Sequence, residues 1–105
     1  MSRLPFSRSQ LIELRRLCER WKVQELAIFG SSLRGELTGE SDLDLLVSYK
    51  PEAEWTLFDE EEFRFQLFRL LARPIDLVNR KAIERSENWI LRKEILGTAE
   101  TIYAA

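Results

Sequence analysis

Among its 105 residues the sequence has no histidine and only one cysteine, Cys18. The lack of histidine excludes Ser-His and Cys-His nucleophilic catalysis, histidine general bases and every metal site that needs an imidazole ligand. A single cysteine forms neither an intramolecular disulfide nor a cysteine-rich zinc or iron–sulfur site. Any chemistry must therefore come from carboxylates, lysine, arginine, hydroxyl groups and backbone amides.

Long hydrophobic runs are also missing. No apolar stretch approaches the length of a membrane-spanning helix, and residues 1–5 lack the apolar run of a signal peptide. We therefore expect a cytoplasmic protein with no membrane partner. With 105 residues, 45% of them hydrophobic, the chain is expected to fold as one domain spanning residues 1–105 around one core.

The net charge of −2, from 16 basic and 18 acidic residues, argues against a general nucleic-acid coat, so we expect no direct nucleic-acid partner. The charges are unevenly placed: residues 1–22 hold six basic and two acidic residues, whereas residues 36–62 hold ten acidic residues and only Lys50 as a basic one. This asymmetry indicates a cation site or a surface for a basic partner. We interpret the acidic run Asp59–Glu62 as the first turn of a helix, because acidic residues are favoured at helix N-termini.

Hydrophobic spacing and turn residues predict alternating helices and strands. Ser7 and Gln10 have capping-box spacing before an amphipathic helix, whose apolar stripe includes Cys18 and predicts a buried thiol. A glycine, Gly97, is expected to end the last helix. The predicted order is α-β-α-β-α-β-α. The seven elements cover residues 8–21, 23–29, 33–37, 42–47, 56 or 59 to 71, 75–78 and 81–96. Residues 101–103 either add a short strand or fray.

Two carboxylates interrupt one of the predicted strands. Asp42 and Asp44 are two residues apart, so on a strand they share one face at a spacing of roughly 6.6 Å, while the apolar residues between and after them face the core. The two carboxylates repel each other, and removing their hydration costs free energy. A bound divalent cation offsets both effects. Asp76 poses the same problem in the strand 75–78. If the two strands are neighbours, three carboxylates converge, which suits metal-assisted phosphoryl or nucleotidyl transfer.

A possible phosphate site precedes these carboxylates. Gly30 and Ser31 follow a predicted buried strand and lead towards a short helix, so backbone N–H groups are exposed where an anion binds readily. Arg34, about one turn later, offers a charge-assisted contact to a phosphate. The carboxylates, the Gly30-Ser31 turn and Arg34 are each weak evidence for a functional site when taken alone. The interpretation rests on their occurrence together.

Taken together, Gly30-Ser31, ten intervening residues and Asp42-x-Asp44 resemble the signature of the nucleotidyltransferase superfamily related to DNA polymerase β. Within it, residues 28–47 look like a minimal nucleotidyltransferase (MNT) protein, and Asp76 occupies the place of the third carboxylate. The resemblance spans roughly residues 23–78. It implies an α/β (α+β) fold with the polymerase β-like nucleotidyltransferase core, a small mixed sheet flanked by helices.

The resemblance also implies an activity. Small MNT proteins are similar to the antitoxins of HEPN/MNT toxin–antitoxin pairs, in which Mg²⁺-dependent transfer of AMP from ATP to a tyrosine hydroxyl silences a HEPN ribonuclease toxin. By this resemblance Gly30, Ser31 and Arg34 bind the nucleotide. Asp42, Asp44 and Asp76 are then the catalytic and metal-binding residues, with Asp76 as second-metal ligand or base. The implied partner is a HEPN-domain toxin in a hetero-oligomer.

Two alternatives remain at this stage. The protein is either a non-catalytic antitoxin that acts by binding and occlusion, or a nucleotidyltransferase that modifies a small molecule. The carboxylate triad disfavours the first, because occlusion needs no metal site, and the absence of residues for an acceptor-binding domain disfavours the second. Tyr49, Trp55 and Trp89 are candidates for a partner surface, since aromatic residues are enriched at interface hot spots, and core positions are an equal possibility for the tryptophans.

Overall fold

The computed structural model describes residues 6–30 and 42–105. In this part of the chain the helices and strands follow one another as α1 (Arg8–Arg20), β1 (Val23–Ile28), β2 (Leu43–Tyr49), α2 (Leu57–Leu71), β3 (Ile75–Asn79), α3 (Arg80–Glu84), α4 (Trp89–Thr98) and β4 (Glu100–Ala104). The expected short helix over 33–37 and the turn after it lie outside the described residues.

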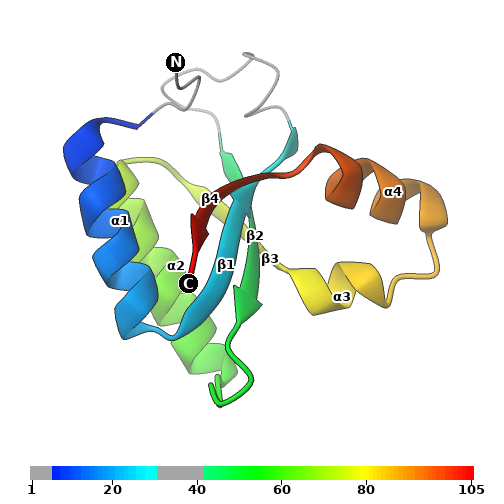
Figure 1. Cartoon of the computed structure of the whole chain (residues 1–105), viewed down its shortest axis with the longest axis horizontal. Helices are drawn as coiled ribbons and strands as arrows, with labels where there is room; N and C mark the ends of the chain where they lie inside the picture. The colour runs from blue at the N-terminus through cyan, green and yellow to red at the C-terminus, as the bar shows by residue number, and fades with distance from the viewer. Residues whose placement is uncertain (1–5, 31–41) are drawn as a thin grey trace.

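The four described strands form one mixed sheet in the order β3-β2-β1-β4 (Figure 1). β2 pairs antiparallel with β1 and parallel with β3, and β4 adds antiparallel to β1 at the other edge. Of the two alternatives left open for residues 101–103, a short strand or a frayed end, the structure shows the strand, β4. The connection from β2 to β3 passes through α2, as a parallel pair requires a crossover. This small mixed sheet flanked by helices is the fold class expected from the sequence.

Helices α1 and α2 cover one face of the sheet, which we call the first face (Figure 1). Residues of β2 at alternate positions, Leu43, Leu45 and Val47, are fully buried there against Phe63 of α2. Cys18 of α1 lies in the same core with no exposure, and burial raises the pKa of its thiol to about 12. The predicted buried, unreactive cysteine is therefore confirmed.

Both helix starts on this face use the side chains that the sequence suggested. The Ser7 hydroxyl accepts from the backbone N–H of Gln10, whose side chain accepts from the N–H of Ser7, so α1 has the predicted capping box. Thr56 and Asp59 form the same reciprocal pair at α2, where Asp59 and Glu60 occupy the first turn. The acidic run therefore begins at a helix N-terminus, as expected.

Among the described residues, α3 and α4 cover the second face of the sheet, and they pack there through Ile83 and Ile95 (Figure 1). The single helix predicted over 81–96 is wrong, because one helix ends at Glu84 and a second begins at Trp89. Asn88 caps a new helix there by accepting from the backbone N–H of Leu91. Gly97 lies inside α4 rather than at its end, so the predicted glycine C-cap is also wrong.

Candidate active site

A glycine with a left-handed backbone ends the first strand. Gly30 follows β1 and has φ of +71°, which a residue without a Cβ adopts at little cost. A Cβ at this position would lie 2.5 Å from Oδ2 of Asp44, too close for any real contact. The backbone N–H of the preceding residue, Phe29, donates to the carbonyl oxygen of Asp44 at 3.1 Å. The glycine therefore lets the end of β1 lie directly against the Asp44 carboxylate.

Asp76 comes to the same place from the neighbouring strand. β2 and β3 are parallel, and Asp44 pairs with Asp76 in their register. Because paired residues of adjacent strands point to the same side, both carboxylates lie on the second face, opposite α1 and α2. The prediction that the two acidic strands are neighbours is confirmed, and this is the relationship that the linear sequence left conditional.

Asp42 precedes β2 and is exposed, and Asp76 is exposed at the edge strand. Burial raises the pKa of the Asp44 carboxyl, and the negative charges of Asp76 and Asp42 raise it further, as does a hydrogen bond that the protonated carboxyl donates to Asp76. This electrostatic coupling shows that the three carboxyl groups lie near one another. The repulsion predicted from their spacing is present at Asp44.

Within residues 6–30 and 42–105, no three Asp, Glu or Cys side chains are arranged to hold a metal ion by themselves. Mg²⁺, however, is usually held by one or two carboxylates together with substrate phosphates. The donors at this site are carboxylate oxygens, which suit a hard cation, and the repulsion around Asp44 is the cost that a cation removes. The residues therefore fit Mg²⁺ together with a phosphate-bearing substrate.

The other two predicted nucleotide-binding residues, Ser31 and Arg34, lie outside the described residues. Gly30 is the described residue of that predicted phosphate turn. It lies directly beside Asp44.

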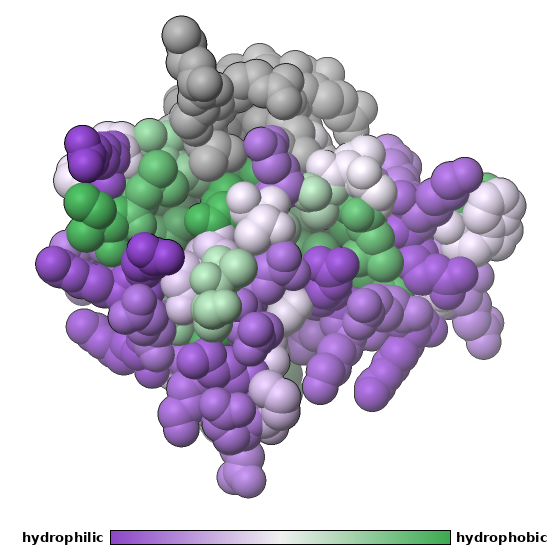
Figure 2. All heavy atoms as spheres, in the orientation of Figure 1, coloured by the Kyte–Doolittle hydropathy of each residue, from purple (hydrophilic) through white to green (hydrophobic). Residues whose placement is uncertain are grey.

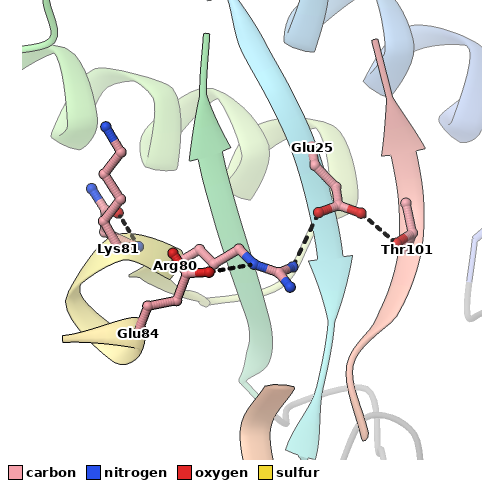
Figure 3. Close-up of polar contacts among 6 residues, drawn as sticks. Glu25, Arg80, Lys81, Glu84 and Thr101 are labelled. Atoms are coloured by element: carbon pink, nitrogen blue, oxygen red, sulfur yellow. Dashed lines mark hydrogen bonds and ion pairs between the residues drawn. The ribbon is translucent and has the colours of Figure 1, made fainter. Parts of the chain in front are cut away.

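An ion-pair network on the same face was not predicted. Glu25 of β1 accepts from Arg80 at 3.1 Å and from the Thr101 hydroxyl at 2.8 Å, and Arg80 also lies 3.6 Å from Glu84 (Figure 3). The contact joins α3 to β1 and β4, and Arg80 directly follows the strand that carries Asp76. Charged residues 55 positions apart give no sequence pattern, so only the sheet order reveals this pair.

The aromatic residues proposed for a partner surface divide into two kinds. Trp55 donates its indole N–H to the carbonyl oxygen of Trp21 at 2.8 Å, and its ring stacks on Tyr49 with centroids 4.0 Å apart. These two residues pack against the first-face core and have a structural role. Trp89 is 60% exposed at the start of α4, so it alone of the three presents most of its ring to solvent.

No helix within the described ranges is long and apolar enough to cross a membrane. This agrees with the short hydrophobic runs of the sequence.

Among curated proteins, the chain is 37% identical over 81 residues to protein adenylyltransferase MntA of Thermococcus cleftensis, covering 76% of this chain and 79% of that protein. Among solved structures, it is 31% identical to a candidate minimal nucleotidyltransferase, with 89% of each chain covered and a TM-score of 0.69.

More distant solved structures share the fold. One is a toxin–antitoxin bound to AMP-PNP, at 21% identity and a TM-score of 0.68, covering 90% of this chain and 73% of that one. Another is the tri-AMPylated HEPN toxin of Shewanella oneidensis in complex with MNT antitoxin, at 17% identity and a TM-score of 0.60, covering 92% and 71%. The family model of the nucleotidyltransferase domain matches residues 13–100. With Gly30 against Asp44, and Asp44 beside Asp76, the chain belongs to the nucleotidyltransferase domain family.

Proposed function

We propose that this protein is an antitoxin-type protein adenylyltransferase, which transfers AMP from ATP to a tyrosine hydroxyl of a cognate HEPN ribonuclease toxin and so neutralises it. The observation that carries the proposal is the Asp44–Asp76 pair beside Gly30 in a chain of this family. The named activity of the MntA relative and the tri-AMPylated HEPN toxin bound to an MNT antitoxin support the reaction and the partner.

In this reaction the tyrosine oxygen forms a bond to the α-phosphorus of ATP, and the bond from that phosphorus to the bridging oxygen breaks. Pyrophosphate leaves with the electron pair, and the hydroxyl proton passes to a carboxylate. Asp76 suits that last role by position, because it is exposed at the edge strand where an acceptor can approach.

Asp42, Asp44 and Asp76 would hold Mg²⁺, which when bound neutralises the charge of the triphosphate and of the developing transition state. By the family resemblance, Gly30, Ser31 and Arg34 would hold the triphosphate. The half-buried Asp44 carboxylate lies against Gly30, so a phosphate bound at that turn would be directly beside it.

The direct test is to incubate the protein with its cognate HEPN partner, ATP and Mg²⁺ and to measure the intact mass of both proteins. We expect the partner to gain one or more AMP units and peptide mapping to place them on tyrosine. Omission of Mg²⁺ and replacement of both Asp42 and Asp44 by Asn are the controls, and both should abolish the gain. A stable complex with unchanged masses would instead indicate inhibition by occlusion.

A further inference from the structure

A groove separate from the carboxylate site lies between α1 and the edge strand β4. It has a volume of about 470 Å³ and is lined on the strand side by residues 101–104. The helix side is formed by Arg8, Leu11, Ile12 and Arg15. In Figure 2, apolar surface gathers between the N-terminal half of α1 and β4, with hydrophilic groups around it, and the arginines that line the groove are charged. The groove therefore has an apolar floor and a charged rim.

The four helix residues form one stripe, since they follow the spacing i, i+3, i+4 and i+7. Arg8 and Arg15 are two turns apart, about 10.5 Å along the helix, and the apolar pair lies between them. Neither arginine forms an ion pair with any residue of the described ranges. Ile12 is 48% exposed. The stripe thus presents two positive charges, neither paired with a described residue, on either side of an apolar patch.

On the other wall, β4 lies at the end of the strand order, so one side of its backbone has no strand partner among the described residues. Leu26 pairs with Tyr103 and Ala27 with Thr101, which leaves Ile102 as the extra residue of a bulge. Ile102 and Tyr103 consequently both pack on the α1 side. An edge strand next to a groove can accept an extended peptide through main-chain hydrogen bonds. The bulge limits such pairing to few residues, so contacts to α1 must supply the rest.

We propose that this groove binds an extended acidic segment of a partner protein, which lies along β4 with an acidic, an apolar and an acidic side chain turned towards α1. Alternate residues of an extended chain share one side at about 6.6 Å, so two acidic residues four positions apart span about 13 Å. Flexible arginine side chains two helical turns apart bridge that span, and the apolar residue between the acids covers Leu11 and Ile12.

A peptide fits better than a nucleic acid, because the groove combines a strand edge and an apolar floor with its two positive charges. A phosphate backbone has no alternating N–H and C=O groups for the strand and no apolar side chain for the floor.

The probe is the capped peptide Thr-Glu-Thr-Val-Thr-Glu-Thr, titrated into the full-length ¹⁵N-labelled protein while backbone amide shifts are recorded. We expect saturable shifts concentrated at residues 101–104 and in the first half of α1. Replacing both glutamates of the peptide by lysine should weaken binding at least tenfold, a control that leaves the protein unchanged.

The matched protein variants are Arg8→Glu with Arg15→Glu, and Arg16→Glu with Arg20→Glu. Both pairs make the same change in net charge on α1, but only the first lies in the groove. The groove pair should weaken binding at least tenfold and the other pair less than threefold. Equal weakening by the two pairs, shifts located elsewhere, or no saturable binding would overturn the proposal. So would tighter binding of a uridine oligonucleotide at the same residues, or a dilution series showing that a second copy of the chain occupies the groove.

Discussion

The carboxylate of Asp44 occupies the space that a side chain at residue 30 would need. Oδ2 of Asp44 lies 2.5 Å from the position of a Cβ on Gly30, and the φ of Gly30 is +71°. Two independent constraints, a close contact and a left-handed backbone, therefore disfavour other residues at the end of β1. The glycine and the aspartate act as a pair, although 14 positions separate them.

Gly30→Ala should destabilise the protein by about 1–3 kcal/mol, because a Cβ adds backbone strain and displaces the Asp44 carboxylate. Urea denaturation followed by circular dichroism measures the change. Gly97→Ala is the control: no atom lies within 4 Å of that Cβ, and the residue is inside α4. There alanine should stabilise by up to about 1 kcal/mol. Equal effects of the two substitutions would contradict the close contact at Gly30.

Replacing both Asp42 and Asp44 by Asn should slow AMP transfer by at least about a hundredfold. The substitution keeps the side-chain shapes but removes charges proposed to hold the cation, and each 1.36 kcal/mol of lost transition-state stabilisation is tenfold in rate. Partner binding should persist. Single-turnover transfer rates and partner affinity, both measured on wild type and the double variant, separate the two effects. Transfer at the wild-type rate would refute the assignment of these carboxylates.

Asp44→Asn should also change how stability depends on pH. The folded-state pKa of Asp44 is raised above its ordinary value, so its contribution favours folding below the unfolded pKa and is lost as the pH rises through the folded pKa. The variant should therefore match wild type near pH 3.5 and become the more stable of the two towards pH 7. Free energies of unfolding in chelator-containing buffer measure this, with exposed Glu52→Gln as the control. If the difference in free energy of unfolding between variant and wild type does not vary with pH, folding does not disfavour the charged form of Asp44.

The two tryptophans Trp55 and Trp89 should respond in opposite ways to alanine. Trp55 contacts Trp21 through a hydrogen bond and Tyr49 through ring stacking, so Trp55→Ala should cost about 3 kcal/mol. Trp89 is 60% exposed, so Trp89→Ala should stay within about 0.5 kcal/mol of wild type. Thermal and urea unfolding of the two variants test this. A large loss of stability in Trp89→Ala would mean that its ring has a structural role.

An acidic docking face over residues 36–62 stays a prediction that follows from charge alone. Part of this segment lies outside the described residues, and within the described part Glu61 is already paired with Arg64 at 2.7 Å. We expect association with the toxin to accelerate at low ionic strength. Stopped-flow association rates across a salt series measure this, and a flat dependence would mean that these acids are ordinary surface charges.

The sequence alone determined the local features of this protein. Period-2 and period-3.6 apolar patterns predicted most strands and helices, because burying one face is a local property of residue order. Ser7 and Gln10 predicted the start of α1, and the apolar stripe predicted the burial of Cys18, since both depend on neighbours within a few turns. The spacing of Asp42 and Asp44, from which their metal-binding role is proposed, is local in the same way.

Tertiary structure decided which distant residues meet. The Asp44–Asp76 pair depends on β2 and β3 being parallel neighbours, and the Glu25–Arg80 pair depends on α3 packing against β2, the neighbour of β1. The break between α3 and α4 did have a local signal, because Ser86 and Asn88 are residue types that favour caps and turns, and reading residues 81–96 as one helix overlooked it. The groove between α1 and β4 exists only because the last strand returns to the edge beside the first helix. Such contacts depend on sheet order and on long-range burial, and no single stretch of sequence encodes them.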